Sequence, residues 1–153
     1  IIDMGAFERQ SDLDGDGLSD NFEIANSVPA SAVGLDPMQD NDADGLTAME
    51  EFAYGLSDLR GDYHNTPSGT ILRLNNLDYL AISYPQNPQA QAYLQVDVLR
   101  SSDHGINDSW DIGETVISDR TFSADGNALV TERSLTPMQG QMREFLKILV
   151  TKR

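Results

Sequence analysis

Apolar residues in the first third of the chain recur at helical spacing in two separate stretches. The first stretch, residues 18–28, places four apolar side chains three or four positions apart: Leu18, Phe22, Ala25 and Val28. Pro29 is expected to end that helix. The second stretch, residues 46–56, has the same kind of spacing: Leu46, Met49, Phe52, Ala53 and Leu56. Thr47 and Glu50 form a capping-box sequence at its start, and Gly55 is expected to end it.

From residue 71 onward the pattern changes to the alternation typical of β-strands. Two alternating runs stand out: Leu80, Ile82 and Tyr84, then Leu94, Val96 and Val98. Residues 114–122 and 128–133 flank a turn sequence at 124–127, so a hairpin is expected there. Residues 144–151 are expected to form a buried last strand. Strands at this spacing predict an antiparallel sandwich or barrel-like domain, and the predicted fold class of the whole chain is α+β.

These patterns divide the chain into four parts. Residues 1–10 are expected to be an N-terminal arm or the end strand of an upstream domain. Residues 11–60 contain two loop–helix units, residues 61–70 are a linker rich in Gly, Pro, Asn and Ser, and residues 71–153 form the β-domain. The chain starts with Ile1 and shows no signal-peptide pattern, so we expect it to be part of a longer protein.

An acidic motif begins before each helical stretch, and its two copies start 28 residues apart. Both copies have Asp at positions 1, 3 and 5, Gly at position 6 and Glu at position 12, which is the template of a calcium loop. The side-chain ligands predicted for the first site are Asp12, Asp14, Asp16, Asp20 and Glu23. Those predicted for the second site are Asp40, Asp42, Asp44 and Glu51. The position-7 carbonyls, of Leu18 and Leu46, complete the two sets, and two calcium ions are predicted.

Position 9 distinguishes the two motifs. The first motif has Asp20 there, whereas the second has Ala48, so a water molecule would supply that ligand in the second site. The second site is therefore predicted to be weaker. Magnesium suits these loops less well than calcium, because it prefers a small octahedral shell that retains several waters.

The formal net charge of −15 is concentrated around these motifs. Residues 1–62 contain 15 acidic and two basic residues, and the rest of the chain is close to neutral. Such acidity excludes a nucleic-acid footprint, which needs basic residues. A disordered acidic segment is the alternative. The template spacing and the helical patterns favour ordered metal sites. The chain contains no cysteine, so bound calcium would take the place of a disulfide in a small module.

Residues 11–58 resemble thrombospondin type 3 repeats and the related dockerin-like half EF-hands of bacteria. The resemblance is carried by Asp-Gly-Asp-Gly-Leu-Ser-Asp at 14–20 and Ala-Asp-Gly-Leu-Thr-Ala-Met-Glu-Glu-Phe at 43–52. It implies a loop followed by one helix, without the leading helix of a full EF-hand. Dockerin loops usually close with aspartate, but both loops here close with glutamate, and the dockerin partner-recognition pair is not evident.

Two further phrases resemble parts of large secreted bacterial proteins. Residues 3–8 are similar to the closing strand of right-handed parallel β-helix domains. Ser101-Ser102-Asp103 with Trp110, and the ending at 143–151, resemble small C-terminal β-modules that follow such repeats. The resemblance implies a secreted or cell-surface location, and a non-catalytic, structural or adhesive role for a module that calcium makes rigid.

Nothing in the sequence indicates an enzyme. There is no Gly-x-Ser-x-Gly motif and no phosphate-binding loop, and neither His64 nor His104 has a metal-spaced partner. Four acids outside the motifs are interpreted as turn formers: Asp97, Asp103, Asp108 and Asp111.

Two other roles remain open. Four aromatic residues either line a carbohydrate-binding face or pack in the β-domain: Tyr79, Tyr84, Tyr93 and Trp110. The packing interpretation is favoured. Residues 1–7 could also join another subunit's sheet edge, giving a filament or layer.

Overall fold

The structure is a computed structural model, and it describes residues 11–61, 66–124, 126–138 and 143–153. Two short helices come first, α1 (Asp20–Asn26) and α2 (Ala48–Tyr54). Seven strands and one 3-10 turn, η1 (Ala90–Ala92), follow. The strands are β1 (Ser68–Leu74), β2 (Leu77–Gln86), β3 (Leu94–Ser101), β4 (Asp111–Ile112), β5 (Thr115–Phe122), β6 (Ala128–Ser134) and β7 (Phe145–Lys152). The strand predicted at residues 1–7 lies outside the described residues.

The strands form two antiparallel sheets packed as a sandwich, which confirms the predicted α+β class. One sheet has the strand order β1-β2-β6-β5 and the other β4-β3-β7. The hairpin expected around residues 124–127 joins β5 and β6. A second hairpin joins β1 and β2 through Asn75 and Asn76, both with positive φ, as a tight two-residue turn requires.

Helix α2 has the boundaries and the buried face that its sequence predicts. The Thr47 side chain accepts from the Glu50 amide, and the Glu50 side chain accepts from the Thr47 amide, so the capping box is formed. Gly55 ends the helix in the left-handed conformation, where glycine avoids the steric cost of a Cβ. Met49, Phe52 and Ala53 are buried.

Helix α1 differs from its predicted apolar stripe. The helix begins at Asp20, so Leu18 belongs to the loop, although its side chain is fully buried. Ala25 is exposed and Val28 is 84% exposed, so these two predicted core positions are wrong. Glu23 and Asn26 occupy the buried side instead. The physical reason is that Glu23 is buried beside the acidic loop before the helix, which turns the opposite face of the helix to solvent.

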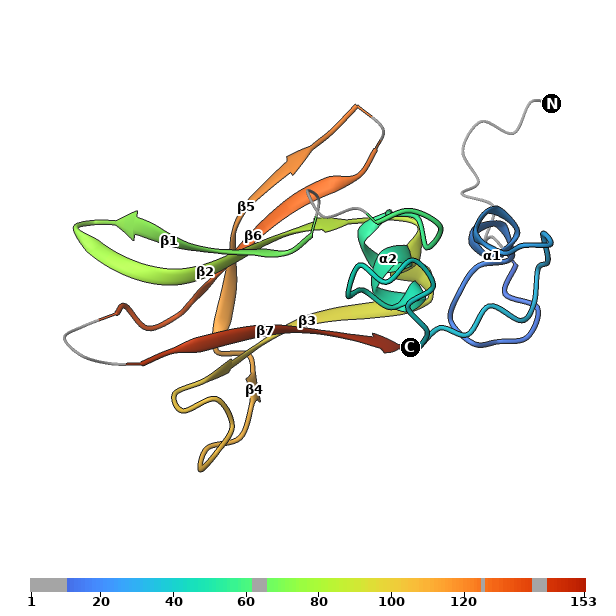
Figure 1. Cartoon of the computed structure of the whole chain (residues 1–153). Helices are drawn as coiled ribbons and strands as arrows, with labels where there is room; N and C mark the ends of the chain where they lie inside the picture. Colours follow the sequence, from blue (N-terminus) through green and yellow to red (C-terminus); the bar gives the residue numbers. More distant parts are fainter. Residues whose placement is uncertain (1–10, 62–65, 125, 139–142) are drawn as a thin grey trace.

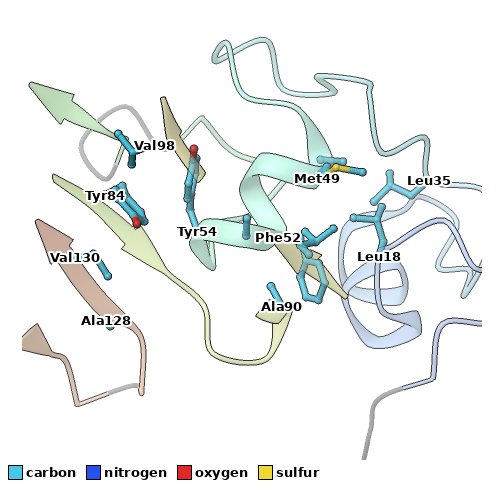
Figure 2. Packing of buried hydrophobic residues seen from close by; sticks show 13 residues of the cluster. Leu18, Leu35, Met49, Phe52, Tyr54, Tyr84, Ala90, Val98, Ala128 and Val130 are labelled. Carbon is cyan, nitrogen blue, oxygen red and sulfur yellow. The ribbon is translucent and has the colours of Figure 1, made fainter. Parts of the chain in front are cut away.

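One hydrophobic core joins the loop–helix units to the sandwich. Figure 1 shows both helices at one end of the sandwich, with α2 against the sheets and α1 outside α2. The Phe52 ring lies 4.9 Å from that of Phe22 and 6.2 Å from that of Tyr93. Figure 2 shows Leu18, Leu35 and Met49 beside Phe52, and Tyr84 and Val130 further along the same cluster. Neither described helix, at seven residues, is long and apolar enough to cross a membrane.

Candidate metal centre

The first acidic loop folds so that its three alternate aspartates converge. Carboxylate oxygens of Asp12, Asp14 and Asp16 lie within 4.8 Å of one another. Backbone amides hold all three carboxylates, and Asp14 accepts from the Asp16 amide at 3.4 Å. Asp12 accepts from the amides of Asp16 at 3.1 Å and Gly17 at 3.2 Å, and Asp16 accepts from the Leu18 amide at 2.8 Å. Three like charges are thus kept together by the fold of the loop, which by itself does not neutralise them.

The second loop repeats this arrangement residue for residue. Oxygens of Asp40, Asp42 and Asp44 also lie within 4.8 Å of one another. Asp40 accepts from the amides of Asp44 at 3.2 Å and Gly45 at 3.0 Å. Asp44 accepts from the Leu46 amide at 2.9 Å. The chain therefore contains two acidic triads of one design that could hold metal ions.

The glutamate at position 12 of each loop gives an independent indication of a cation. Glu23 and Glu51 are both 0% exposed. Oε2 of Glu23 and both carboxylate oxygens of Glu51 are buried without a hydrogen-bond partner. A buried carboxylate without a partner is costly, and a bound cation is one of the few groups that offsets the cost. Asp42 Oδ2 in the second triad is buried and unpartnered in the same way.

The electrostatics of the metal-free centre agree with this interpretation. Burial raises the pKa of Glu51 to about 9, helped by a hydrogen bond to Asp58 and by the charges of Asp42 and Asp44. Glu51 can make that hydrogen bond only while it carries a proton, so once ionised its two oxygens have no donor. Burial also raises the pKa of Glu23, and the nearby carboxylates of Asp14, Asp16 and Asp20 add to the shift. Each glutamate is therefore electrostatically coupled to its own triad. A cation in the triad would reverse these shifts by favouring the ionised form.

The remaining predicted ligands are placed as follows. The Asp20 carboxylate accepts from the Ser11 hydroxyl and, at 2.8 Å, from the Leu13 amide, so it fastens the start of the first loop. Leu18 is fully buried and Leu46 partly buried, and both side chains pack in or against the core. Metal ligation by the Leu18 and Leu46 carbonyls, and by Asp20, stays a prediction.

The donor set favours one class of metal. Every side chain in the two triads and both adjoining glutamates offers carboxylate oxygen, and no histidine or cysteine is among them. Hard cations such as Ca²⁺ prefer such oxygen ligands, whereas Zn²⁺ prefers nitrogen and sulfur. The residues present therefore fit calcium.

The first loop also rests on the sandwich. Lys152 of β7 donates a hydrogen bond from Nζ to the Gly15 carbonyl. A Cβ on Gly17 would lie 3.2 Å from Leu94 Cδ2 and 3.3 Å from Lys152 Cγ, whereas a Cβ on Gly45 would meet nothing within 4 Å. Sequence reasoning missed these contacts, because Leu94 and Lys152 lie far from the first loop in the chain and carry no local signal of proximity. The first acidic loop is thus docked on β3 and β7 at Gly17, whereas the equivalent position of the second loop, Gly45, faces open space.

This difference gives a matched pair of variants. Gly17 and Gly45 both occupy loop position 6, with φ of +103° and +97°. Alanine at either position is expected to cost about 1–2 kcal/mol in backbone strain. Gly17→Ala should cost roughly 1 kcal/mol more, because its Cβ crowds the sandwich. Urea unfolding in saturating calcium measures the difference. Equal losses for the two variants would contradict the docking of the first loop.

Contacts within the fold involve all four aromatic residues that were considered for a carbohydrate face. Tyr84 is 2% exposed, and its hydroxyl donates to Glu132 at 3.2 Å. The Tyr79 ring is covered by the Arg133 guanidinium at 4.4 Å, and the Trp110 ring by Lys147 Nζ at 4.3 Å. The Tyr93 ring packs beside Phe52. These contacts agree with the favoured interpretation, in which the rings pack within the β-domain.

Comparison with known proteins gives no further information about this centre. No family model, no curated protein and no solved structure matches the chain. The resemblance to type 3 repeats therefore stays a prediction based on the loop motifs. The structure itself gives two acidic triads, each beside a fully buried glutamate, on an α+β sandwich.

Proposed function

We propose that the two loop–helix units bind two Ca²⁺ ions and that the bound metal has a structural, non-catalytic role. The observation that carries the proposal is the pair of fully buried glutamates, Glu23 and Glu51, with unpartnered oxygens beside the aspartate triads. A divalent cation supplies each group with the positive charge that its carboxylates lack. Asp12, Asp14, Asp16 and Glu23 would hold one ion, and Asp40, Asp42, Asp44 and Glu51 the other.

A structural role is supported by where the two units lie. Leu18, Met49 and Phe52 belong to the same hydrophobic cluster as Tyr84 and Val130 of the sandwich. Closing the loops around a cation would therefore hold one end of the sandwich together. A calcium sensor needs helices that open to expose a binding groove. Both helices here are seven residues long, and α2 is buried against the sheets, which favours bracing over switching.

A non-catalytic role is supported by the state of the acids outside the loops. Asp103 accepts from the amides of Ile106 and Asn107 at 2.9 and 2.7 Å. Hydrogen bonds from Ser101 and Ser102 hold the pKa of Asp108 well below its usual range. A general acid at neutral pH needs a raised pKa, so these residues suit a loop-forming role.

The proposed location is outside the cell, as a module of a secreted or cell-surface protein. Extracellular calcium modules bind with a Kd of about 10⁻⁴–10⁻³ M, which is useful only where calcium is millimolar. Two surface-acidic loops of this kind fit that concentration range. The proposed metal binding does not depend on which partner or assembly the module belongs to.

Calorimetric titration with calcium tests the proposal. The natural sequence is expected to bind two ions, and Glu23→Gln and Glu51→Gln are each expected to bind one. These variants keep the size of the side chain and remove the charge of one site. Asp119→Asn, an exposed acid on β5, serves as the control that should still bind two. Absence of calcium binding by the natural sequence at millimolar concentration would refute the proposal.

A further inference from the structure

Asp58 is a buried acid that lies outside both twelve-residue loops. It follows α2 in the chain, and it is 0% exposed. Its carboxylate accepts two hydrogen bonds from Asn41, one from the backbone amide at 3.3 Å and one from the side-chain amide. Its own backbone amide donates to Asn26 Oδ1 at 3.0 Å. Because Asn41 is position 2 of the second loop, these contacts fix the Asp58 carboxylate against that loop.

Asp58 lies next to Glu51, because the two carboxyls are within hydrogen-bonding reach of each other. Its partner Asn41 lies between Asp40 and Asp42 in the chain, so Asp58 is also held close to the second triad. While both are ionised, neither Asp58 nor Glu51 can donate a hydrogen bond to the other. In the described parts of the chain, the basic residues in ion pairs are Arg73 and Arg100, and neither is paired with an acid of this centre. A bound cation would therefore stabilise the carboxylates of the second centre.

Among the described residues, the carboxylates that raise the pKa of Glu23 all belong to the first loop itself: Asp14, Asp16 and Asp20. Oε1 of Glu23 accepts from the Leu35 amide at 3.2 Å, a donor that Glu51 lacks. Asp36, which follows α1, is exposed and accepts from the Met38 amide at 3.0 Å, so it forms a turn. At position 9 the first loop has Asp20, whereas the second has Ala48.

We infer that Asp58 is a further carboxylate of the second metal site, replacing the charge that Ala48 does not supply at position 9. This inference rests on the proposed calcium binding. With Asp58 included, each site has five acids: Asp12, Asp14, Asp16, Asp20 and Glu23 in the first, and Asp40, Asp42, Asp44, Glu51 and Asp58 in the second. The affinity of such sites rises with the number of ligand charges. The second site is therefore not the weak one that position 9 alone predicts.

The test uses the Glu23→Gln background, in which only the second site remains. Asp58→Asn is expected to weaken calcium binding there by about tenfold, because one of five charges is lost. Asp36→Asn, which changes an exposed acid between α1 and the second loop, should leave the affinity unchanged. Asp58→Asn also removes a carboxylate acceptor from Asn41, so its melting temperature in chelator does not decide the test, and the calcium affinity of the folded variant does.

A purely structural Asp58 would behave differently. The calcium affinity of the folded variant would then stay within twofold of its background. That result overturns the inference while leaving calcium binding by the natural sequence intact. If the natural sequence bound no calcium, the proposed function itself would fail first, so the two failures are distinguishable.

A second variant keeps the test decisive if Asp58→Asn does not fold. Asn41→Asp combined with Asp58→Asn exchanges the two residues, so that an amide and a carboxylate still pair while the charge moves from a buried to an exposed position. This exchange is expected to weaken the second site by about tenfold as well. An affinity equal to the background would overturn the inference. If neither variant folds even in excess calcium, Asp58 is a structural residue and the inference is wrong.

Discussion

Replacing Phe52 by alanine is expected to lower the free energy of unfolding by about 3–5 kcal/mol. Phe52 is 2% exposed and packs between Phe22 of the first unit and Tyr93 of the β-domain. Its backbone carbonyl accepts from the Asn87 side chain at 3.0 Å. The cavity left by the variant would therefore open at the junction of three parts of the fold, which cannot easily collapse around it.

The matched control is Phe122→Ala. Phe122 is 67% exposed on β5, so its removal is expected to change stability by no more than about 0.5 kcal/mol. Urea unfolding followed by Trp110 fluorescence reports on the β-domain, and far-ultraviolet circular dichroism also reports on the helices. For Phe52→Ala, both signals should shift to lower urea together. An unchanged Trp110 transition would mean that the β-domain folds independently of the loop–helix units.

Removing calcium is expected to lower the melting temperature. With Kd values of about 10⁻⁴–10⁻³ M, two sites at 1 mM calcium contribute about 1–3 kcal/mol by linkage. For a chain of this size that corresponds to roughly 2–11 °C. Protease cleavage within residues 11–59 should increase in parallel, because the like charges of the open loops repel one another.

The calcium effect is expected to depend on pH in a defined direction. In the metal-free fold, burial raises the pKa of Glu51 from 4.5 to about 9. The protonated Glu51 carboxyl is therefore favoured in the folded chain relative to the unfolded chain. The stability that this protonation contributes is lost as pH rises from 4.5 to 9. The metal-free chain should melt higher at pH 5.5 than at pH 8. Calcium binding needs the ionised carboxylate. The difference in melting temperature between calcium and chelator should therefore be larger at pH 8 than at pH 5.5.

Paired melts in calcium and in chelator at these two pH values measure the effect. Glu51→Gln is the control for the pH dependence, because it removes the titrating group. In this variant the melting-temperature difference between calcium and chelator should change less from pH 5.5 to pH 8. Identical melts in calcium and in chelator at both pH values would contradict a structural role for the metal. If the melting-temperature difference between calcium and chelator were equal at pH 5.5 and pH 8, the assignment of the pH dependence to Glu51 would be contradicted.

The elements with local signals were predictable from the sequence. Thr47, Glu50 and Gly55 mark the ends of α2 by chemistry that acts within a few residues, and the structure confirms each of them. The aspartate triads follow from loop spacing alone. Strand alternation predicted the sandwich, although the Asn75–Asn76 hairpin was not identified, because neither residue is glycine and its positive φ is visible only in the structure.

What the sequence did not predict depends on polar burial and long-range contact. Hydrophobic periodicity placed Ala25 and Val28 in the core, but the buried face of α1 carries Glu23 and Asn26. A pattern that counts only apolar residues cannot detect a buried carboxylate. Asp58 likewise reads as one more acid in an acidic segment. Only its burial, and its contacts with Asn41, connect it to the second site.

The most direct test of the account is the anomalous scattering map of crystals grown in millimolar calcium. The account predicts two metal peaks among the described residues, one enclosed by Asp12, Asp14, Asp16 and Glu23, the other by Asp40, Asp42, Asp44 and Glu51. Both glutamates should turn their unpartnered oxygens to the metal. Well-ordered loops without a metal peak, or peaks that leave Glu23 and Glu51 unligated, would contradict it.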